Sequence, residues 1–173
     1  MAGCGSGGGG AHATPAADSS YGSLPSFLPS EKGTADSILT GTPGNPAVTS
    51  EGDLVRAVVG SGSVQISVLG PVVPGEGLPK VTAATTCTWT VTMQDATSEI
   101  PIRTGDFVAL DEEGHPYHPQ LIPGQPKPPA AIRPGQTVKF QLRVVMPTGE
   151  GVMRWSPVGG KVLGVWDFVV END

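Results

Sequence analysis

The segment 80–93 alternates strictly between two kinds of side chain, and this period of two constrains the fold more than any other feature of the chain. Most odd positions are apolar, including Cys87, Trp89, Val91 and Met93, while the even positions are mostly threonine. Successive side chains of a β-strand point to opposite faces of the sheet, so the pattern predicts a strand with one buried and one threonine-rich face. The same alternation from Thr137 to Met146 predicts a second such strand.

Shorter apolar segments flank these two strands and are separated by turn residues such as Gly, Pro and Asp. They predict strands at residues 54–59, 64–69, 100–103, 106–110, 152–155 and 161–170. The last segment is apolar on both faces and is expected to be paired in the interior of a sheet or covered by a loop, because an open apolar edge promotes aggregation. No segment has a helical period. The chain is therefore predicted to be all-β, an antiparallel sandwich of seven to eight strands.

The first fifty residues differ in composition from the rest of the chain. They contain ten glycines and five prolines but only four charged residues, and their apolar residues follow no period. Such a segment buries too little surface to offset its chain entropy. Residues 1–50 are therefore predicted to be a disordered tether, and residues 51–173 the sandwich domain.

One connection within the predicted domain is rich in proline. Seven prolines lie from Pro116 to Pro134, both included. Proline cannot donate a hydrogen bond to a sheet, so this segment is expected to form turns and polyproline II structure. The favoured interpretation is a stiff surface crossover between two sheets, and the alternative is a recognition segment for a partner.

Cys4 follows Ala2 and Gly3 and precedes a glycine-rich run. This arrangement resembles the end of a bacterial lipoprotein signal, where small residues precede the cysteine that receives lipid. No charged and apolar leader stands before it, so the native product is expected to be longer at the gene level and lipid-modified at Cys4 in the cell. The alternatives are an accidental Ala-Gly-Cys sequence in a cytosolic protein or a cloned linker.

Two stretches resemble a known family. Residues 106–117 resemble a Phe-x-x-Leu-x-(acidic)-x-x-Gly-x-x-Tyr strand–turn–strand motif, and residues 132–147 resemble a Pro-Gly-Glu turn that opens a strand ending in Pro. Together they are similar to the immunoglobulin-like domain of unknown function in secreted lipoproteins of Gram-positive, actinobacterial type. The small secreted immunogenic proteins of mycobacteria are similar in outline. The resemblance implies a non-enzymatic, immunoglobulin-like β-sandwich at the cell envelope.

The charge and motif content exclude several functions. The chain has 10 basic and 16 acidic residues and a net charge of -6, which argues against nucleic acid as a partner. No apolar run approaches the ~20 residues of a membrane span. Nucleophile elbows, phosphate loops and dinucleotide fingerprints are absent from the sequence, so no enzyme activity and no cofactor are predicted.

The turn 111–118 holds the best candidate for chemistry. Asp111, Glu113, His115 and His118 carry carboxylate and imidazole groups, which bind transition metals. A charged hairpin turn with surface histidines is the favoured interpretation, and a zinc or copper site is the alternative. Tyr117 is a further candidate binding residue. An exposed Trp155 could stack on a carbohydrate, although all three tryptophans are expected in or near the core.

The sequence thus predicts a lipid-anchored envelope protein that presents a binding or structural module outside the membrane. Its expected partners are other envelope proteins or the cell-wall polymer. The alternative function is an envelope metal-binding protein that uses the acidic and histidine-containing turn.

Overall fold

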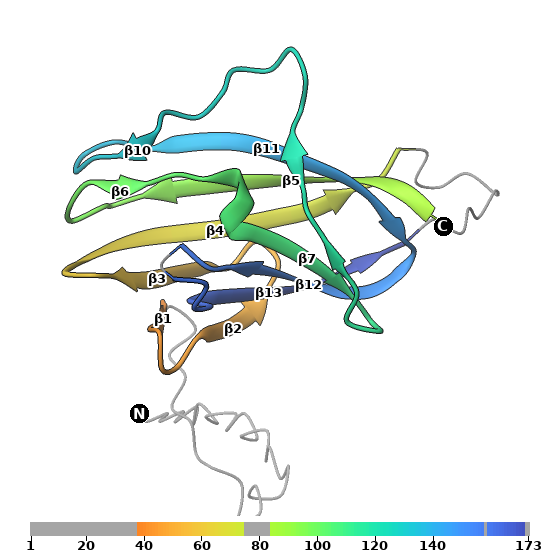
Figure 1. Cartoon of the computed structure of the whole chain (residues 1–173), viewed down its shortest axis with the longest axis horizontal. Helices are drawn as coiled ribbons and strands as arrows, with labels where there is room; N and C mark the ends of the chain where they lie inside the picture. Colours follow the sequence, from red (N-terminus) through yellow and green to blue (C-terminus); the bar gives the residue numbers. More distant parts are fainter. Residues whose placement is uncertain (1–37, 75–83, 158, 172–173) are drawn as a thin grey trace, which may run out of the picture. The chain divides into compact units, whose positions relative to one another are not determined.

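The computed structural model describes residues 38–74, 84–157 and 159–171. These residues form thirteen β-strands and one short 3-10 helix, Thr104–Asp106. Most of the strands belong to two large sheets that together have a sandwich-like arrangement (Figure 1). The β-sandwich class predicted from the alternating segments is therefore confirmed.

The six-stranded sheet contains the longest strands and has the order β1-β3-β4-β5-β11-β9. In Figure 1 the long strands β4, β5 and β11 run side by side across the molecule. The six strands are β1 (Leu39–Gly41), β3 (Leu54–Val59), β4 (Gly62–Val72), β5 (Ala84–Gln94), β9 (Gln120–Leu121) and β11 (Val138–Pro147).

The five-stranded sheet is built from shorter strands in the order β2-β13-β12-β7-β8, and a two-stranded sheet pairs β10 with β6. The strands are β2 (Ala47–Ser50), β7 (Phe107–Asp111), β8 (Pro116–Tyr117), β12 (Gly149–Trp155), β13 (Gly164–Val170), β6 (Ile100–Pro101) and β10 (Ala131–Ile132). The strand β13 lies between two partners, as its two apolar faces predicted.

Two strand pairs are parallel, β1 with β3 and β2 with β13, and both lie at the margin of their sheets. The prediction of a purely antiparallel sandwich is therefore wrong at these two edges. The sheets of immunoglobulin-like domains are antiparallel, and these two strand pairs depart from that pattern. The immunoglobulin-like assignment therefore stays a prediction.

The core is one cluster of buried apolar side chains supplied by both sheets. The alternation seen in the sequence places Cys87, Trp89, Val91 and Met93 of β5 on the inner face, and the threonines between them are partly exposed. The inward stripe of β11 pairs directly with these residues, for example Phe140 with Val91. Burying large apolar side chains from both sheets supplies the main stabilisation, roughly 1.5–3 kcal/mol for each fully buried large side chain.

The folded domain begins before residue 51, where the tether was predicted to end. The strands β1 and β2 lie at residues 39–50 and join one sheet each. Gly41 is required there, because a Cβ at this position would clash with the Leu163 carbonyl oxygen. Strands of three and four residues are too short to show a period, which explains why this part of the predicted tether boundary is wrong. The rest of the predicted tether, residues 1–37, lies outside the described residues.

The proline-rich connection crosses from one sheet to the other, as predicted. It includes β8, which pairs with β7 in the five-stranded sheet, and β9, which pairs with β11 in the six-stranded sheet. In Figure 1 the segment that follows forms an arch at the top of the view before it reaches β10. These two-residue strands lie at sheet edges, where proline is tolerated.

Candidate functional site

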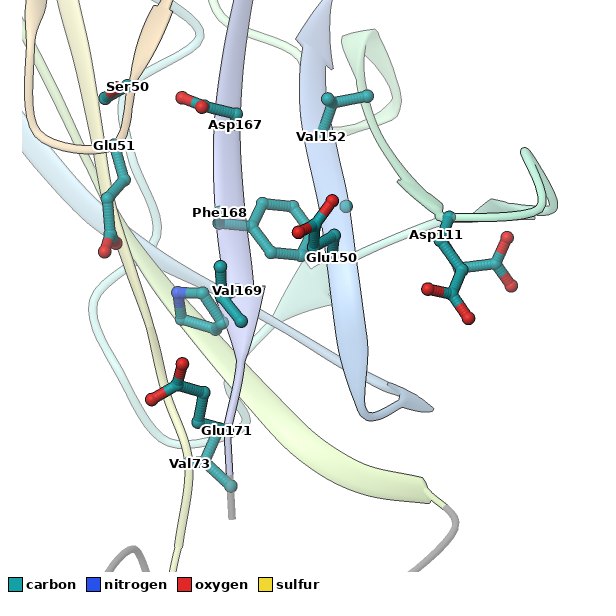
Figure 2. A pocket seen from close by; sticks show the side chains of 13 residues that line it. Ser50, Glu51, Val73, Asp111, Glu150, Val152, Asp167, Phe168, Val169 and Glu171 are labelled. Atoms are coloured by element: carbon teal, nitrogen blue, oxygen red, sulfur yellow. The ribbon is translucent and has the colours of Figure 1, made fainter. Parts of the chain in front are cut away.

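A groove with a volume of about 800 Å³ opens at one end of the five-stranded sheet, next to the end of β4. Its apolar lining comes from Pro71 and Val73 near the end of β4 and from Val152, Phe168 and Val169 of β12 and β13. Figure 2 shows Glu51 and Glu171 on one side of this groove and Asp111 on the other, with Glu150 between them. The groove is therefore assembled from segments that are far apart in the sequence.

The groove is acidic. Six carboxylates line it, and among the residues that the structure describes no Lys, Arg or His does; the six belong to Glu51, Asp111, Glu112, Glu150, Asp167 and Glu171. A cleft lined by charges of one sign concentrates ions of the opposite sign. The groove therefore attracts cationic groups and repels anionic ones.

Glu51 joins the two sheets at the rim of the groove. Its carboxylate accepts a hydrogen bond from the backbone N–H of Gly70 in β4, with a distance of 2.9 Å from N to Oε2. Its own N–H donates to the carbonyl oxygen of Asp167 in β13 at 3.0 Å. The register of β4 against β5 shifts between Leu69 and Val72, and this irregularity presents the Gly70 N–H to Glu51.

Gly151 allows the Phe168 ring to pack closely at the base of the groove. A Cβ at position 151 would lie 2.6 Å from the Leu110 carbonyl oxygen and 2.7 Å from the Phe168 ring. The Phe168 ring in turn makes an edge contact with Trp89 of the other sheet, with the ring centroids 5.2 Å apart. This wall of the groove is therefore fixed by the core.

The acidic turn at the other rim is held together by Asp111. Its Oδ1 accepts hydrogen bonds from the backbone N–H groups of Glu113 at 3.1 Å and His115 at 2.8 Å. Its Oδ2 lies 3.0 Å from the Tyr117 hydroxyl, which donates to it, and 3.2 Å from Nδ1 of His115. Asp residues stabilise turns in this way, so the turn 111–117 is a local structure built around one carboxylate.

These contacts set the pKa values of the turn. Burial acts to raise the pKa of Asp111, whose side chain is only 9% exposed. Hydrogen bonds from the His115 backbone, the Tyr117 hydroxyl and the His115 ring act in the opposite direction, so the pKa of Asp111 is lower than its ordinary value. Burial and the bond to Asp111 raise the pKa of Tyr117.

The structure brings some of the four predicted metal ligands together and leaves one apart. Nδ1 of His115 lies 3.4 Å from Oε2 of Glu113 and also contacts Asp111, so three of the four side chains are close together. His118 is exposed and takes no part in this cluster. Among the described residues, no three His, Cys, Asp or Glu side chains are arranged to hold a metal ion.

The two predicted binding residues, Trp155 and Tyr117, are both engaged with neighbouring side chains of the fold. Trp155 is 1% exposed and stacks on Phe107, with ring centroids 6.2 Å apart, so it cannot stack on a carbohydrate. The alternative hypothesis of an exposed Trp155 is therefore wrong, since Trp155 lies on the inward stripe of β12. Tyr117 is half-buried and its hydroxyl is bonded to Asp111.

Only one of the two cysteines, Cys87, lies among the described residues. Cys4, the predicted lipidation site, lies outside the described residues. Cys87 is fully buried and free, and burial raises the pKa of its thiol to about 12. This confirms the expectation that Cys87 behaves as a small apolar core residue.

Sequence reasoning identified one rim of the groove, the turn at Asp111, but missed the groove itself. Glu51, Glu150, Asp167 and Glu171 are isolated acids in the sequence and follow no motif. The available signal was the outward position of Asp167 in an otherwise apolar strand, but it does not indicate which acids of other strands lie near it.

Comparisons with known proteins support the fold more than the function. The structure is similar to that of MPT63, a secreted protein of Mycobacterium tuberculosis, with a TM-score of 0.50 and 18% sequence identity over 71% of this chain and 98% of MPT63. It also matches part of YcdA, a candidate lipoprotein of Bacillus subtilis, with a TM-score of 0.45 and 12% identity over 62% of this chain and 36% of YcdA. No protein-family model and no curated protein sequence matches the chain.

These comparisons identify the class of the described domain as a β-sandwich with the general fold of MPT63. Within the part of the chain that the structure describes, no helix is long and apolar enough to cross a membrane.

Proposed function

We propose that the chain is a lipid-anchored protein of the cell envelope, in which Cys4 carries the lipid and the β-sandwich is a non-enzymatic binding module. The observation that carries this proposal is the Ala2-Gly3-Cys4 sequence, placed ahead of a separate sandwich domain that begins near residue 38. The similarity of the fold to a secreted mycobacterial protein supports a location outside the cytoplasm.

Anchoring and binding would act together in such a protein. A single acyl chain holds a protein on a bilayer only marginally, so a stable anchor needs more than one chain. The Gly- and Pro-rich segment between Cys4 and the domain, predicted from its composition to be a tether, would let the module search the space above the membrane. Weak binding to an envelope component would then suffice, because tethering raises the local concentration of the module.

Intact-mass analysis of native protein isolated from its own cells tests the anchor. The expected result is a mature chain that begins at Cys4 and carries acyl chains, and that partitions into detergent. Substitution Cys4→Ser should abolish the added mass and release the protein, whereas Cys87→Ala should leave both unchanged. A native protein with unmodified Met1 and a free Cys4 thiol would contradict the proposal.

A further inference from the structure

A second hollow, of about 400 Å³, lies between the proline-rich arch and the beginning of β11. Lys127 and three prolines of the arch line one side, and Gln136, Thr137 and Lys139 line the other. Both lysines are exposed, and no carboxylate from the described part of the chain lines the hollow. Two lysines, a glutamine and a threonine thus line a recess whose positive charge suits an anion.

The six-stranded sheet, whose strand β11 begins at this hollow, is also positively charged on its strands. The six strands of this sheet contain three basic residues, Arg56, Lys139 and Arg143, and no acidic residue. Lys139 and Arg143 are both exposed on the outer face of β11. Four residues of a strand span about 13 Å, so the two charges form a line that leads away from the hollow.

Hydrogen-bonding side chains accompany this line of charge. Thr92, Thr90 and Thr88 of β5 lie directly opposite Lys139, Gln141 and Arg143 of β11 in the sheet register. Gln141 donates a hydrogen bond to the Thr90 hydroxyl at 3.4 Å, which places their side chains on the same face. The outer face therefore offers hydroxyl and amide groups beside regularly placed positive charges.

The carboxylates at this end of the sheet do not cancel the charge of the hollow. Asp95 and Glu99 follow the end of β5, whose Met93 pairs with Val138 at the start of β11. Neither lines the hollow, and Oε2 of Glu99 accepts a hydrogen bond from Nε of Arg133 at 2.7 Å. The lysines of the hollow are therefore left to face an external anion.

We propose that this hollow and the adjoining face of β11 bind a linear, phosphodiester-linked polyol, the kind of anionic polymer found in a cell wall. The inference rests on the proposed envelope location and names the partner of the binding module. A polyol phosphate supplies anionic and hydroxyl oxygens to the lysines, the arginine and the threonines. The three tryptophans are buried, so the module lacks the exposed indoles that stack on sugar rings. A recess beneath an arch fits a single chain better than a planar bilayer.

Titration of the full, anchor-free chain with poly(glycerol phosphate) tests this proposal, with uncharged polyglycerol of matched length as the control ligand. We expect binding to the anionic polymer alone, and we expect it to weaken as salt is added because exposed charges are screened. The double substitution Lys127→Ala with Lys139→Ala should lower the affinity about tenfold or more, since it removes two of the charges that would neutralise phosphates of the polymer.

The matched control is Arg154→Ala, which removes an exposed base from the other sheet and should leave the affinity within about twofold. The charge-retaining change of both lysines to arginine should preserve binding, and circular dichroism should show that every variant is folded. The proposal is overturned if the polymer does not bind, if the lysine and Arg154 variants behave alike, or if vesicles of phosphatidylglycerol bind as well as the polymer. Because the chain carries no lipid in this assay, the result is independent of whether Cys4 is acylated in the cell.

Discussion

The two large sheets of this domain have similarly apolar inner faces, but the charged residues of their strands differ in sign. Both contribute buried tryptophans and aliphatic side chains to one core. On the strands themselves, the six-stranded sheet has three basic and no acidic residues, whereas the five-stranded sheet has Asp111, Glu150 and Asp167 against the single base Arg154. Three further acids, Glu51, Glu112 and Glu171, lie in the groove at the end of the five-stranded sheet.

The sheets also differ in what holds them together. The six-stranded sheet rests on long alternating strands, of which β5 and β11 pair over ten residues. The five-stranded sheet depends more on single close contacts: the Phe168 ring over Gly151, the Trp166 indole on a backbone carbonyl, and the turn around Asp111. Even a substitution that changes few atoms at one of these contacts should therefore destabilise the five-stranded sheet strongly.

The largest effect is expected for Trp155→Ala, which should lower the free energy of unfolding by about 3–5 kcal/mol. Trp155 is 1% exposed and stacks on Phe107, so its removal leaves a large cavity in the core. Urea denaturation measures the loss, with Val169→Ala as a control on an exposed side chain of the same sheet. If Trp155→Ala were as stable as the control, Trp155 would not be part of the core.

A smaller effect, about 1–3 kcal/mol, is expected for Gly151→Ala. The added methyl group would meet the Leu110 carbonyl oxygen and the Phe168 ring, and neither can move without disturbing the sheet or the core. Gly105→Ala is the matched control, because nothing lies within 4 Å of a Cβ at that position. Equal unfolding midpoints for the two variants would contradict the role assigned to Gly151.

The long strands were more accessible to prediction from the sequence than the short strands at the sheet edges, and both sheets contain short strands of this kind. Alternation over residues 80–93 and 137–146 requires a long half-buried strand whatever the partner, and both predictions are confirmed where the structure describes them. The strands β1, β2, β8 and β9 have two to four residues and too few side chains to show a period. Their positions depend on partners elsewhere in the chain, such as the Leu163 carbonyl beside Gly41.

The candidate sites show the same limit. A turn is a local structure, so the sequence could indicate that Asp111, Glu113 and His115 lie close together. It could not show that Asp111 is engaged by its own turn, nor that Glu51 and Glu171 face the same groove. Likewise, the rest of the arch and β10 separate Lys127 from Lys139 in the sequence. The two residues line the same hollow only because the chain returns to β11.

The two core tryptophans Trp166 and Trp89 offer a direct comparison between the sheets. Both are fully buried, but Nε1 of Trp166 donates a hydrogen bond to the Asp53 carbonyl oxygen at 2.9 Å, while Nε1 of Trp89 has no partner among the described residues. Replacement by Phe removes similar volume from each site. Trp166→Phe should therefore destabilise the domain by about 1 kcal/mol more than Trp89→Phe, because it removes a hydrogen bond that Trp89 does not make. Equal losses in urea denaturation would show that the Trp166 bond adds nothing net.

The smallest effect concerns the pH dependence of the turn at Asp111. Its pKa is lower in the folded state than the ordinary value of about 3.9, so the ionised carboxylate stabilises the fold. This contribution is complete above the ordinary pKa and is lost as the pH falls through the folded value. Urea midpoints of the wild type should therefore fall more steeply on acidification below about pH 4 than those of Asp111→Asn, which has no charge to lose.

Glu112→Gln is the matched control for this comparison, because it removes an exposed charge from the same turn and should keep the wild-type slope. Tyr117→Phe should give an intermediate slope, since it removes one of the donors that lower the pKa of Asp111 while leaving the two backbone donors in place. If Asp111→Asn and Glu112→Gln had the same acid dependence, the hydrogen bonds of the turn would not stabilise the ionised form of Asp111. The stability of this edge of the five-stranded sheet would then come from its strands alone, as it does in the six-stranded sheet.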